Sequence, residues 1–437
     1  MCEKRKPMLE MFLMLLFIFL VSNQNSYAQW SKQTTGLPTS SAMGYAPSID
    51  ASDESTAVCV TRSGVSNIFR TVNGGVGWSQ LSAPEEAGYI WDVSIIDSSH
   101  IWVCDGDGKI FATGDGGSSW VLQFSDSTKT EFMNYIEMFD ISNGVAMGDG
   151  VDLTNNPAGP PLFLNTSDGG AQWISVNDSA IGGYSGDTWR RLDFVSLTVG
   201  YFFESGINPQ VLLKTEDGGK SWIQTNYADY VQVMSFFDEN IGLIISGAGH
   251  VERTVDGGET WESFSSPHSG WGNDIEFSPD DPAMVWMTDH KKLYFSSDTG
   301  RTWVTQMSSC EGSDIVFVDS WTGWVACSNG VYFTNSGGTT DIPDEFLSQP
   351  HVFELEQNFP NPFNASTTIL YRLKNDAEVS LSVFNLVGQK IAVLINSKQS
   401  PGSHHVQWHT RGLPSGIYYY RLEAGDYQQT RKLILLR

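Results

Sequence analysis

A phrase of eight residues recurs along most of the chain and constrains its fold more than any other feature. The clear copies are TVNGGVGW (71–78), TGDGGSSW (113–120), TSDGGAQW (166–173), TEDGGKSW (215–222), TVDGGETW (254–261) and SSDTGRTW (296–303), and a degenerate copy, TNSGGTTD, lies at 334–341. The tryptophans that end successive clear copies are 42, 53, 49, 39 and 42 residues apart. A repeat of this length is typical of a unit of four short strands.

The residues between two copies support this interpretation. After Trp78 the chain has four strand-like runs, YIWDVSIID (89–97), IWVCDGDG (101–108), KIFATGDGG (109–117) and SSWVLQF (118–124), with turn residues between them. The repeated phrase therefore falls at the turn between the third and fourth strands of a unit. The predicted fold class is all-β, with a β-propeller whose blades are the repeats.

The two ends of the repeat region predict how the ring closes. The last copy lacks its tryptophan and its fourth strand, whereas residues 29–35 carry an unassigned Trp30 and enough residues for one strand. We expect residues 29–35 to supply the outer strand of the last blade. This gives a propeller of seven blades over residues 29–341, with no open sheet edges at the point of closure.

The repeated phrase resembles the Asp-box, or BNR repeat, of sialidase-like and photosystem II assembly-factor-like propellers. In such a turn an aspartate accepts hydrogen bonds from backbone N–H groups and a nearby hydroxyl, a glycine supplies positive φ, and the tryptophan packs between sheets. The alternative, a catalytic or calcium-binding role, is disfavoured because a propeller spreads these side chains around its circumference. The structural aspartates are Asp115, Asp168, Asp217, Asp256 and Asp298.

The N-terminus predicts export. Residues 4–6 are basic, residues 11–21 are apolar, and Ser26-Tyr27-Ala28 is a small-residue ending, so residues 1–28 are expected to be a signal peptide cleaved after Ala28. The alternative, an uncleaved anchor, is disfavoured because the apolar run is shorter than a membrane span. No transmembrane segment is expected in the mature chain.

Four cysteines remain after this segment, and none has metal-ligand spacing. One or two disulfides are compatible with an oxidising compartment. The favoured interpretation of Cys59, Cys104 and Cys327 is that of small buried hydrophobic residues, because each lies in an apolar, strand-like run. No metal site and no cofactor are predicted.

The composition changes after a linker at residues 342–350. Residues 29–350 contain 42 acidic and 13 basic side chains, a balance of −29, whereas residues 351–437 contain 6 acidic and 9 basic ones, a balance of +3. Alternating runs broken by glycine and proline predict a small β-sandwich over residues 351–437. The negative charge of the propeller argues against nucleic acid as a partner.

The tail resembles the type A C-terminal sorting domain of the type IX secretion system. The resemblance rests on the QNFPNPFN run at 357–364, the Val387-Gly388-Gln389 turn, Ser415-Gly416-Ile417-Tyr418 and the closing KLILL at 432–436. It implies recognition by the type IX outer-membrane translocon and a secreted or cell-surface location. The sorting-signal residues are Pro360, Asn361, Pro362, Gly388, Gly416 and Lys432.

The propeller itself is expected to bind a glycan or a protein at the mouth of its channel. Loops between second and third strands, and connections between blades, place aromatic side chains among polar ones there. The ligand-binding candidates are Trp189, Arg190, Arg191, Tyr230, His250, Trp271 and His290. Resemblance to photosystem II assembly-factor-like proteins, which are non-catalytic scaffolds, favours a binding module.

Enzymatic alternatives remain open. A sialidase is disfavoured because the arginine triad and the Arg-Ile-Pro-like motif are missing, and one propeller cannot build the cleft of the two-propeller xyloglucan-cleaving enzymes. A polysaccharide-degrading glycoside hydrolase would need a carboxylate pair at the mouth, for which Glu204 and Asp289 are the candidates. Absence of catalysis is the favoured expectation.

Overall fold

The computed structural model consists of two compact units, residues 1–340 and 341–437. The structure describes residues 30–38, 43, 47–63, 65–151, 159–176, 192–204, 210–227, 229–268, 270–338, 354–355, 358, 361, 363–364, 366–373, 376–399, 402–410, 413–425 and 427–436. These residues form strands and turns and contain no helix, which confirms the all-β prediction. Accordingly, no helix within these ranges has the length and apolarity needed to cross a membrane.

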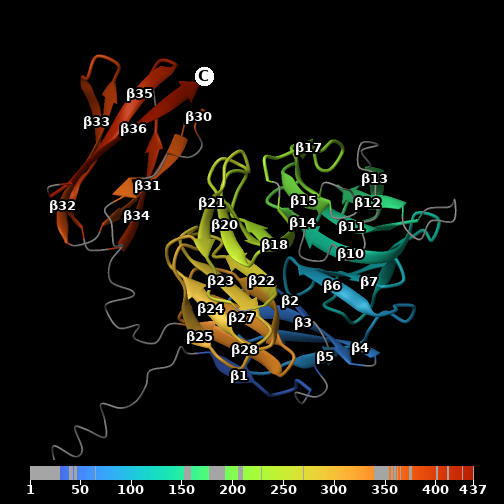
Figure 1. Ribbon diagram of the computed structural model, residues 1–437. Helices are drawn as coiled ribbons and strands as arrows, with labels where there is room; N and C mark the ends of the chain where they lie inside the picture. Colours follow the sequence, from blue (N-terminus) through green and yellow to red (C-terminus); the bar gives the residue numbers. More distant parts are fainter. Residues whose placement is uncertain are drawn as a thin grey trace, which may run out of the picture. The chain divides into compact units, whose positions relative to one another are not determined.

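The described part of the first unit contains seven sheets of four antiparallel strands, which fit the blades of a propeller (Figure 1). The first three sheets are β2 (Ser48–Asp53), β3 (Thr56–Ser63), β4 (Val65–Val72) and β5 (Ser79–Leu81); β6 (Ile90–Ile95), β7 (Ile101–Asp105), β8 (Lys109–Thr113) and β9 (Val121–Ser125); and β10 (Thr130–Met138), β11 (Gly144–Gly150), β12 (Gly159–Thr166) and β13 (Ile174–Val176). The next three are β14 (Leu192–Phe194), β15 (Gly200–Glu204), β16 (Val211–Thr215) and β17 (Ile223–Gln224); β18 (Val231–Phe236), β19 (Gly242–Ser246), β20 (His250–Thr254) and β21 (Glu262–Ser265); and β22 (Gly272–Phe277), β23 (Val285–Asp289), β24 (Leu293–Ser296) and β25 (Val304–Met307). The seventh combines β26 (Gly312–Phe317), β27 (Thr322–Cys327) and β28 (Gly330–Asn335) with β1 (Ser31–Gln33).

The core lies between successive sheets. The second strands are the most deeply enclosed, and every residue of β7, β15, β19 and β23 is buried. One apolar cluster joins Val58 and Ile68 of the first sheet to Val93 and Phe111 of the second. At the sixth boundary the rings of Trp286 and Phe317 stack with their centroids 3.5 Å apart. Because each sheet buries both faces against its neighbours, its stability depends on the presence of both.

The repeated turn has the same hydrogen bonds in successive sheets. In the second sheet Thr113 Oγ1 donates to Asp115 Oδ1 over 2.8 Å, and Asp115 in turn accepts from the backbone N–H of Ser119 over 2.9 Å and from its hydroxyl over 2.6 Å. The Ser119 hydrogen bonds lower the pKa of Asp115 to about 2. Asn73 takes the same place in the first sheet, since its amide oxygen accepts from Thr71 and from Gly77. A carboxylate is therefore replaceable at this position by any side chain with the same acceptor.

The repeated turn is also hydrogen-bonded to the turn between the first and second strands of its own sheet. In each of the seven described sheets the residue after the aspartate, or after Asn73 or Ser336 in its place, donates its backbone N–H to a carbonyl of the turn between first and second strands. The distances are 2.7 to 3.0 Å: Gly74 to Ser55, Gly116 to Ser99, Gly169 to Ser142, Gly218 to Thr198, Gly257 to Asn240, Thr299 to Ala283 and Gly337 to Trp321. The six glycines have φ between +62° and +76°. Thr299 has φ +56° and is the one non-glycine residue with positive φ among those described.

The seventh sheet is completed from the other end of the unit. β1 pairs antiparallel with β28, with Ser31, Lys32 and Gln33 opposite Phe333, Tyr332 and Val331. Trp30 Nε1 donates to Gln306 Oε1 over 2.9 Å, and the Trp30 ring lies edge-on to Phe317 with centroids 5.9 Å apart. The first described residues of the unit are thus held against its last two sheets (Figure 1).

The second unit has two sheets. One contains β29 (Glu354–Leu355), β31 (Ser366–Leu373) and β34 (Gly402–His409), and the other contains β30 (Phe363–Asn364), β36 (Tyr427–Leu436), β35 (Gly416–Ala424), β32 (Ala377–Asn385) and β33 (Lys390–Gln399). Their side chains share one core, in which Tyr371 and Trp408 of the smaller sheet join Leu381, Tyr420 and Leu433 of the larger.

We predict that Trp30→Ala lowers the free energy of unfolding by about 2 kcal/mol, because it removes a hydrogen bond and an aromatic contact from the point of closure. Denaturant unfolding followed by far-UV circular dichroism measures the change. The matched control is Trp321→Ala, since Trp321 lies in a turn and is 55% exposed, and its effect should stay within about 0.5 kcal/mol. Equal effects of the two substitutions would contradict a stabilising role for the N-terminal segment.

Candidate functional site: the channel and the mouth face

A central cavity of about 400 Å³ is lined by the innermost strands of all seven sheets. Seven of the described lining side chains are carboxylic acids, and none of the described lining residues is a lysine, arginine or histidine: Asp50, Asp92, Glu137, Asp193, Asp274, Glu276 and Asp314. In the described residues there is no group of three or more His, Cys, Asp or Glu side chains suited to holding a metal ion.

Most of these acids connect one sheet to the next. Asp50 Oδ2 of the first sheet accepts from the backbone N–H of Ile95 in the second over 2.8 Å, and Asp314 of the seventh accepts from Ile49 of the first, also over 2.8 Å. The corresponding bonds run from Ile136 to Asp92 (3.0 Å), Phe236 to Asp193 (2.5 Å) and Ile315 to Asp274 (2.7 Å). We call these bonds the inter-sheet clasps.

The two remaining boundaries have clasps of a different kind. The hydroxyl oxygen of Tyr135 accepts from the backbone N–H of Phe194, and the Gln232 side-chain oxygen accepts from the backbone N–H of Gly272 over 2.8 Å. Each of the seven boundaries between described inner strands therefore has one. The clasps satisfy backbone donors on the inner strands, which would otherwise face the channel unpaired.

Confinement in the channel favours the neutral form of several acids. Burial raises the pKa of Asp50 to about 7, against hydrogen bonds from Ile95 and Ala51 that lower it, and burial also raises the pKa of Asp193 to about 7. Burial, together with the charge of Asp193, raises the pKa of Glu137 well above its usual value, and that of Glu276 is raised by burial and by the charge of Asp274. Some of the acids that the composition counts as negative charges are therefore partly protonated near neutral pH.

One end of the sheets carries most of the candidate binding residues. Because the strands alternate in direction, the turns between second and third strands lie at the same end as the connections between sheets. Hydrogen bonds join these two sets: Gly106 donates to the carbonyl of Tyr89 over 2.8 Å and Gly247 to that of Tyr230 over 2.6 Å. We call this end the mouth face.

An aromatic cluster lies on the mouth face at the fourth, fifth and sixth sheets. Phe203 is buried, Tyr230 packs edge-on against it with centroids 5.4 Å apart, and Trp271 packs edge-on against Tyr230 at 5.9 Å. Trp271 is nevertheless 52% exposed. The Gln232 clasp fixes the backbone of the next residue, Gly272, so an exposed indole is held on a rigid support.

The other candidates have different surroundings. His250 begins β20 and His290 follows β23, and both are exposed. The pairing of Gly272 with Asp289 brings His290 close to Trp271, just beyond the end of the ladder. Trp189, Arg190 and Arg191 lie outside the described residues.

The two acids proposed as a catalytic pair lie apart in the fold. Glu204 ends β15 and Asp289 ends β23, in sheets separated by the β18–β21 sheet, and both are buried. Asp289 has a structural role, because it accepts from the backbone N–H groups of Lys291 and Lys292, both over 2.7 Å, and from the Tyr294 hydroxyl over 2.8 Å. Asp105 caps the equivalent turn of the second sheet, where it accepts from Lys109 over 2.8 Å.

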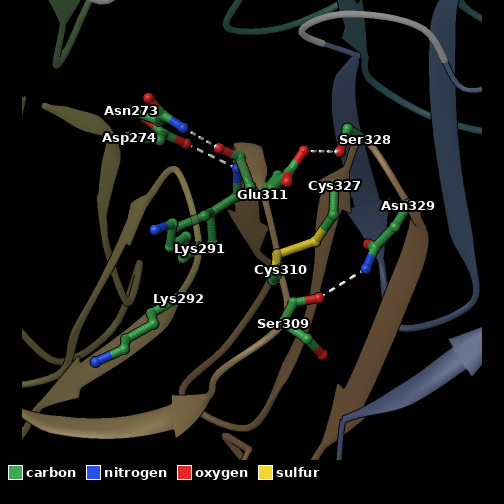
Figure 2. Close-up of a disulfide and its surroundings, with 12 residues drawn as sticks. Asn273, Asp274, Lys291, Lys292, Ser309, Cys310, Glu311, Cys327, Ser328 and Asn329 are labelled. Atoms are coloured by element: carbon green, nitrogen blue, oxygen red, sulfur yellow. Dashed lines mark hydrogen bonds between the residues drawn. A yellow bond between two sulfur atoms is a disulfide. The ribbon is translucent and has the colours of Figure 1, made fainter.

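A disulfide joins Cys310 and Cys327 on the same face (Figure 2). The favoured sequence interpretation of Cys327 was therefore wrong, whereas Cys59 and Cys104 are buried and not part of a disulfide, as expected. The linkage was missed because Cys310 lies in a connection, and only the pairing of β26 with β27, in which Gly312 lies opposite Cys327, brings the two cysteines together. The Cys310 N–H also donates to Lys291 O over 3.0 Å, which ties the β23–β24 turn to the seventh sheet.

Two further residues of this region lie outside the list of ligand-binding candidates: His268, which the sequence places in a connection between blades, and Lys291, which sequence reasoning did not single out. His268 lies beside the β19–β20 turn, and burial lowers its pKa against the opposing charge of Asp289. Lys291 is exposed on the β23–β24 turn, and its side chain points away from the disulfide in Figure 2. The histidine-lysine-lysine run at 290–292 in a strongly acidic domain was the available signal.

Of the predicted sorting-signal residues that the structure describes, Asn361, Gly388 and Gly416 lie at turns or a strand end of the second unit, and Lys432 lies within β36. Asn361 Oδ1 accepts from the backbone N–H of Ile434 over 2.7 Å, Gly388 has φ +79° in the β32–β33 turn, Gly416 begins β35, and Lys432 lies opposite Tyr419 in β36. Pro360 and Pro362 lie outside the described residues.

Comparisons with known proteins agree with this division. Residues 357–436 match the secretion system C-terminal sorting domain, which indicates export by the type IX secretion system to the cell surface or outside. No curated protein matches the chain in sequence.

Solved structures resemble the first unit in fold. YCF48 bound to D1 peptide is 19% identical, with a TM-score of 0.57, over 71% of this chain and 98% of that one. YCF48 from Cyanidioschyzon merolae is 17% identical, with a TM-score of 0.53, over 71% and 99%. The WD40 β-propeller domain of Doa1 is 10% identical, with a TM-score of 0.51, over 74% and 100%. At these identities the likeness shows a propeller-like fold alone.

The channel acids predict that stability falls as pH rises. Asp50 has a pKa of about 7 in the folded protein and 3.8 as its ordinary value, so its contribution is complete below about pH 4 and is lost as the pH rises through 7. We expect the thermal midpoint to fall by about 2–6 °C between pH 5 and pH 8. Asp50→Asn keeps an oxygen for Ile95, so it should flatten this dependence and exceed the wild type in stability at pH 8.

The control for this measurement is Asp115→Asn in the exposed turn of the second sheet. Asp115 is ionised throughout this pH range, so its substitution should alter stability without altering the slope. A slope that Asp50→Asn leaves unchanged would show that Asp50 does not titrate in this range.

We predict that the Cys310→Ser, Cys327→Ser double variant loses about 3 kcal/mol of stability, since the bond closes a loop with a sequence separation of 17 residues. Denaturant unfolding with and without a thiol reductant measures the loss. Reductant present during unfolding should lower the free energy of unfolding of the wild type to that of the variant, and it should leave the value of the variant unchanged. An equal response of both proteins to reductant would argue against a stabilising disulfide.

Proposed function

We propose that the chain is an exported, non-catalytic binding module whose propeller presents the mouth face to a saccharide. The observation that carries the proposal is Trp271, a half-exposed indole held in place by the Tyr230 edge contact and by the Gln232 clasp. A rigid aromatic face in water is suited to stacking on the C–H groups of a sugar ring and loses little conformational entropy on binding.

The domain organisation belongs to the same proposal. Residues 1–28 are the signal peptide, residues 29–341 a closed propeller of seven blades, residues 342–350 a linker and residues 351–437 a sandwich-like sorting domain that the type IX outer-membrane translocon recognises. The seven four-stranded sheets, the pairing of β1 with β28 and the shared core of the second unit support it. The propeller is then the cargo of its own C-terminal domain.

The positions of the acids weigh against glycoside hydrolysis. A retaining or inverting enzyme needs two carboxyl groups about 5 to 9.5 Å apart across a sugar. Glu204 and Asp289 are buried in different, non-adjacent sheets, and Asp289 is occupied by three hydrogen bonds of its own turn. A protein ligand is the other outcome to test, since one structural neighbour was solved with a bound peptide.

The test is a glycan array and a polysaccharide-depolymerisation screen with the full chain. We expect saccharide binding without product release, and Trp271→Ala should weaken it at least about tenfold, which corresponds to about 1.4 kcal/mol. Trp321→Ala is the matched control, because Trp321 is equally exposed but lies at the opposite end of the sheets, in the turn between β26 and β27.

Three outcomes would overturn the proposal. Saccharide binding that survives Trp271→Ala would move the site elsewhere. Product release that is lost in a Glu204→Gln, Asp289→Asn double variant would make the protein an enzyme. If the protein binds no saccharide but binds a peptide in a way that depends on Trp271, the ligand is a protein.

A further inference from the structure

The chemistry beside Trp271 narrows the class of saccharide that the mouth face would take. This inference rests on the proposed function, because it uses the same indole as the stacking platform. The added observation is a fixed basic turn that carries His290 and Lys291 and begins directly after Asp289, opposite the residue that follows Trp271.

The register of the sixth sheet places the turn. Gly272, directly after Trp271, lies opposite Asp289, directly before His290, so the indole and the start of the turn flank the same end of the β22–β23 ladder. The turn is held from two sides. Asp289 accepts from the N–H groups of Lys291 and Lys292, and Lys291 O accepts from Cys310, which the disulfide links to β27.

The charge of Lys291 is not neutralised within the described part of the protein. Three other propeller lysines have a carboxylate partner within 4 Å: Lys109 with Asp107 at 3.8 Å, Lys129 with Asp126 at 3.3 Å and Lys214 with Glu216 at 3.4 Å. Neither Lys291 nor His290 has such a partner among the described residues, and both are exposed.

The nearby acids are already engaged. Asp289 is buried within its own turn, and Glu311 accepts from the Ser328 hydroxyl over 2.7 Å (Figure 2). Residues 29–350 have a formal balance of −29, so the run of three basic residues at 290–292 stands out in an acidic sequence. The negative charge of the first unit repels an acidic ligand in general, and the basic turn would offset this repulsion beside Trp271.

We propose that the mouth face binds a saccharide that contains uronic acid, with one pyranose ring stacked on Trp271 and its carboxylate beside Lys291 and His290. Stacking supplies contact that any sugar ring can make, and the cationic turn supplies the preference for a carboxylate. Neutral sugars should therefore bind in the same place but more weakly.

The experiment uses pairs of probes that differ only in charge. Polygalacturonate, alginate and a glucuronate-containing polymer are each compared with the corresponding methyl ester, by titration calorimetry on the full chain. For at least one polymer we expect the acid to bind about fivefold or more tightly than its ester, and the difference should shrink at 0.5 M salt, because exposed charges are screened.

Two variants separate this inference from the proposed function. Lys291→Gln should remove the preference for the acid and leave binding of the ester unchanged, whereas Trp271→Ala should weaken both. Lys220→Gln, at an exposed lysine in the repeated turn at the opposite end of its sheet, is the matched control and should change neither.

The failures are distinguishable. Equal binding of every acid and its ester, with both dependent on Trp271, would overturn the uronate inference and leave the saccharide site in place. A preference for acid that Lys291→Gln does not reduce would also overturn it. Binding of no saccharide at all would overturn the proposed function together with it.

Discussion

The structure of the first unit depends on hydrogen bonds that cross from one sheet to the next at the channel. A four-stranded sheet satisfies its own ladder, but the inner strand has N–H groups that face the channel. A carboxylate, a phenol or an amide on the neighbouring inner strand meets one of these donors at each of the seven described boundaries. Apolar packing between sheets is non-directional, so the clasps add the specificity that fixes how each sheet meets its neighbour.

The clasps also explain why acids accumulate where no ligand requires them. A carboxylate is a strong acceptor, but several of them in one chamber repel one another and lose hydration. The raised pKa values of Asp50 and Asp193 are the physical result, and protonation relieves the repulsion while one oxygen still accepts. In the repeated turn the same residue type has the opposite environment, and the pKa of Asp115 is lowered by Ser119. Identical side chains thus serve as connectors under different electrostatic conditions.

The repeat made much of the fold predictable from the sequence. Turn residues, strand-like runs and spacing between tryptophans depend on short-range chemistry, which is why the all-β class and the four-stranded units could be foreseen. The channel acids could not be, because Asp50, Asp92 and Asp314 lie in ordinary alternating runs and acquire a role only when seven inner strands face one another. The same applies to Cys310, whose partner depends on β26 pairing with β27, and to Asp289, whose neighbours make it a turn cap rather than a free acid.

Completion of the seventh sheet by β1 has a consequence for the order of folding. Ser31 and Phe333, which the pairing brings together, are 302 residues apart in the chain, so closure is a contact of very high sequence separation and is entropically expensive. The ring cannot close before its last sheet exists, and until then β28 is an open edge. The disulfide acts on that same sheet through a loop of only 17 residues. The disulfide can hold β26 and β27 in register locally. The three-stranded part of the seventh sheet is then already formed when β1 pairs with β28.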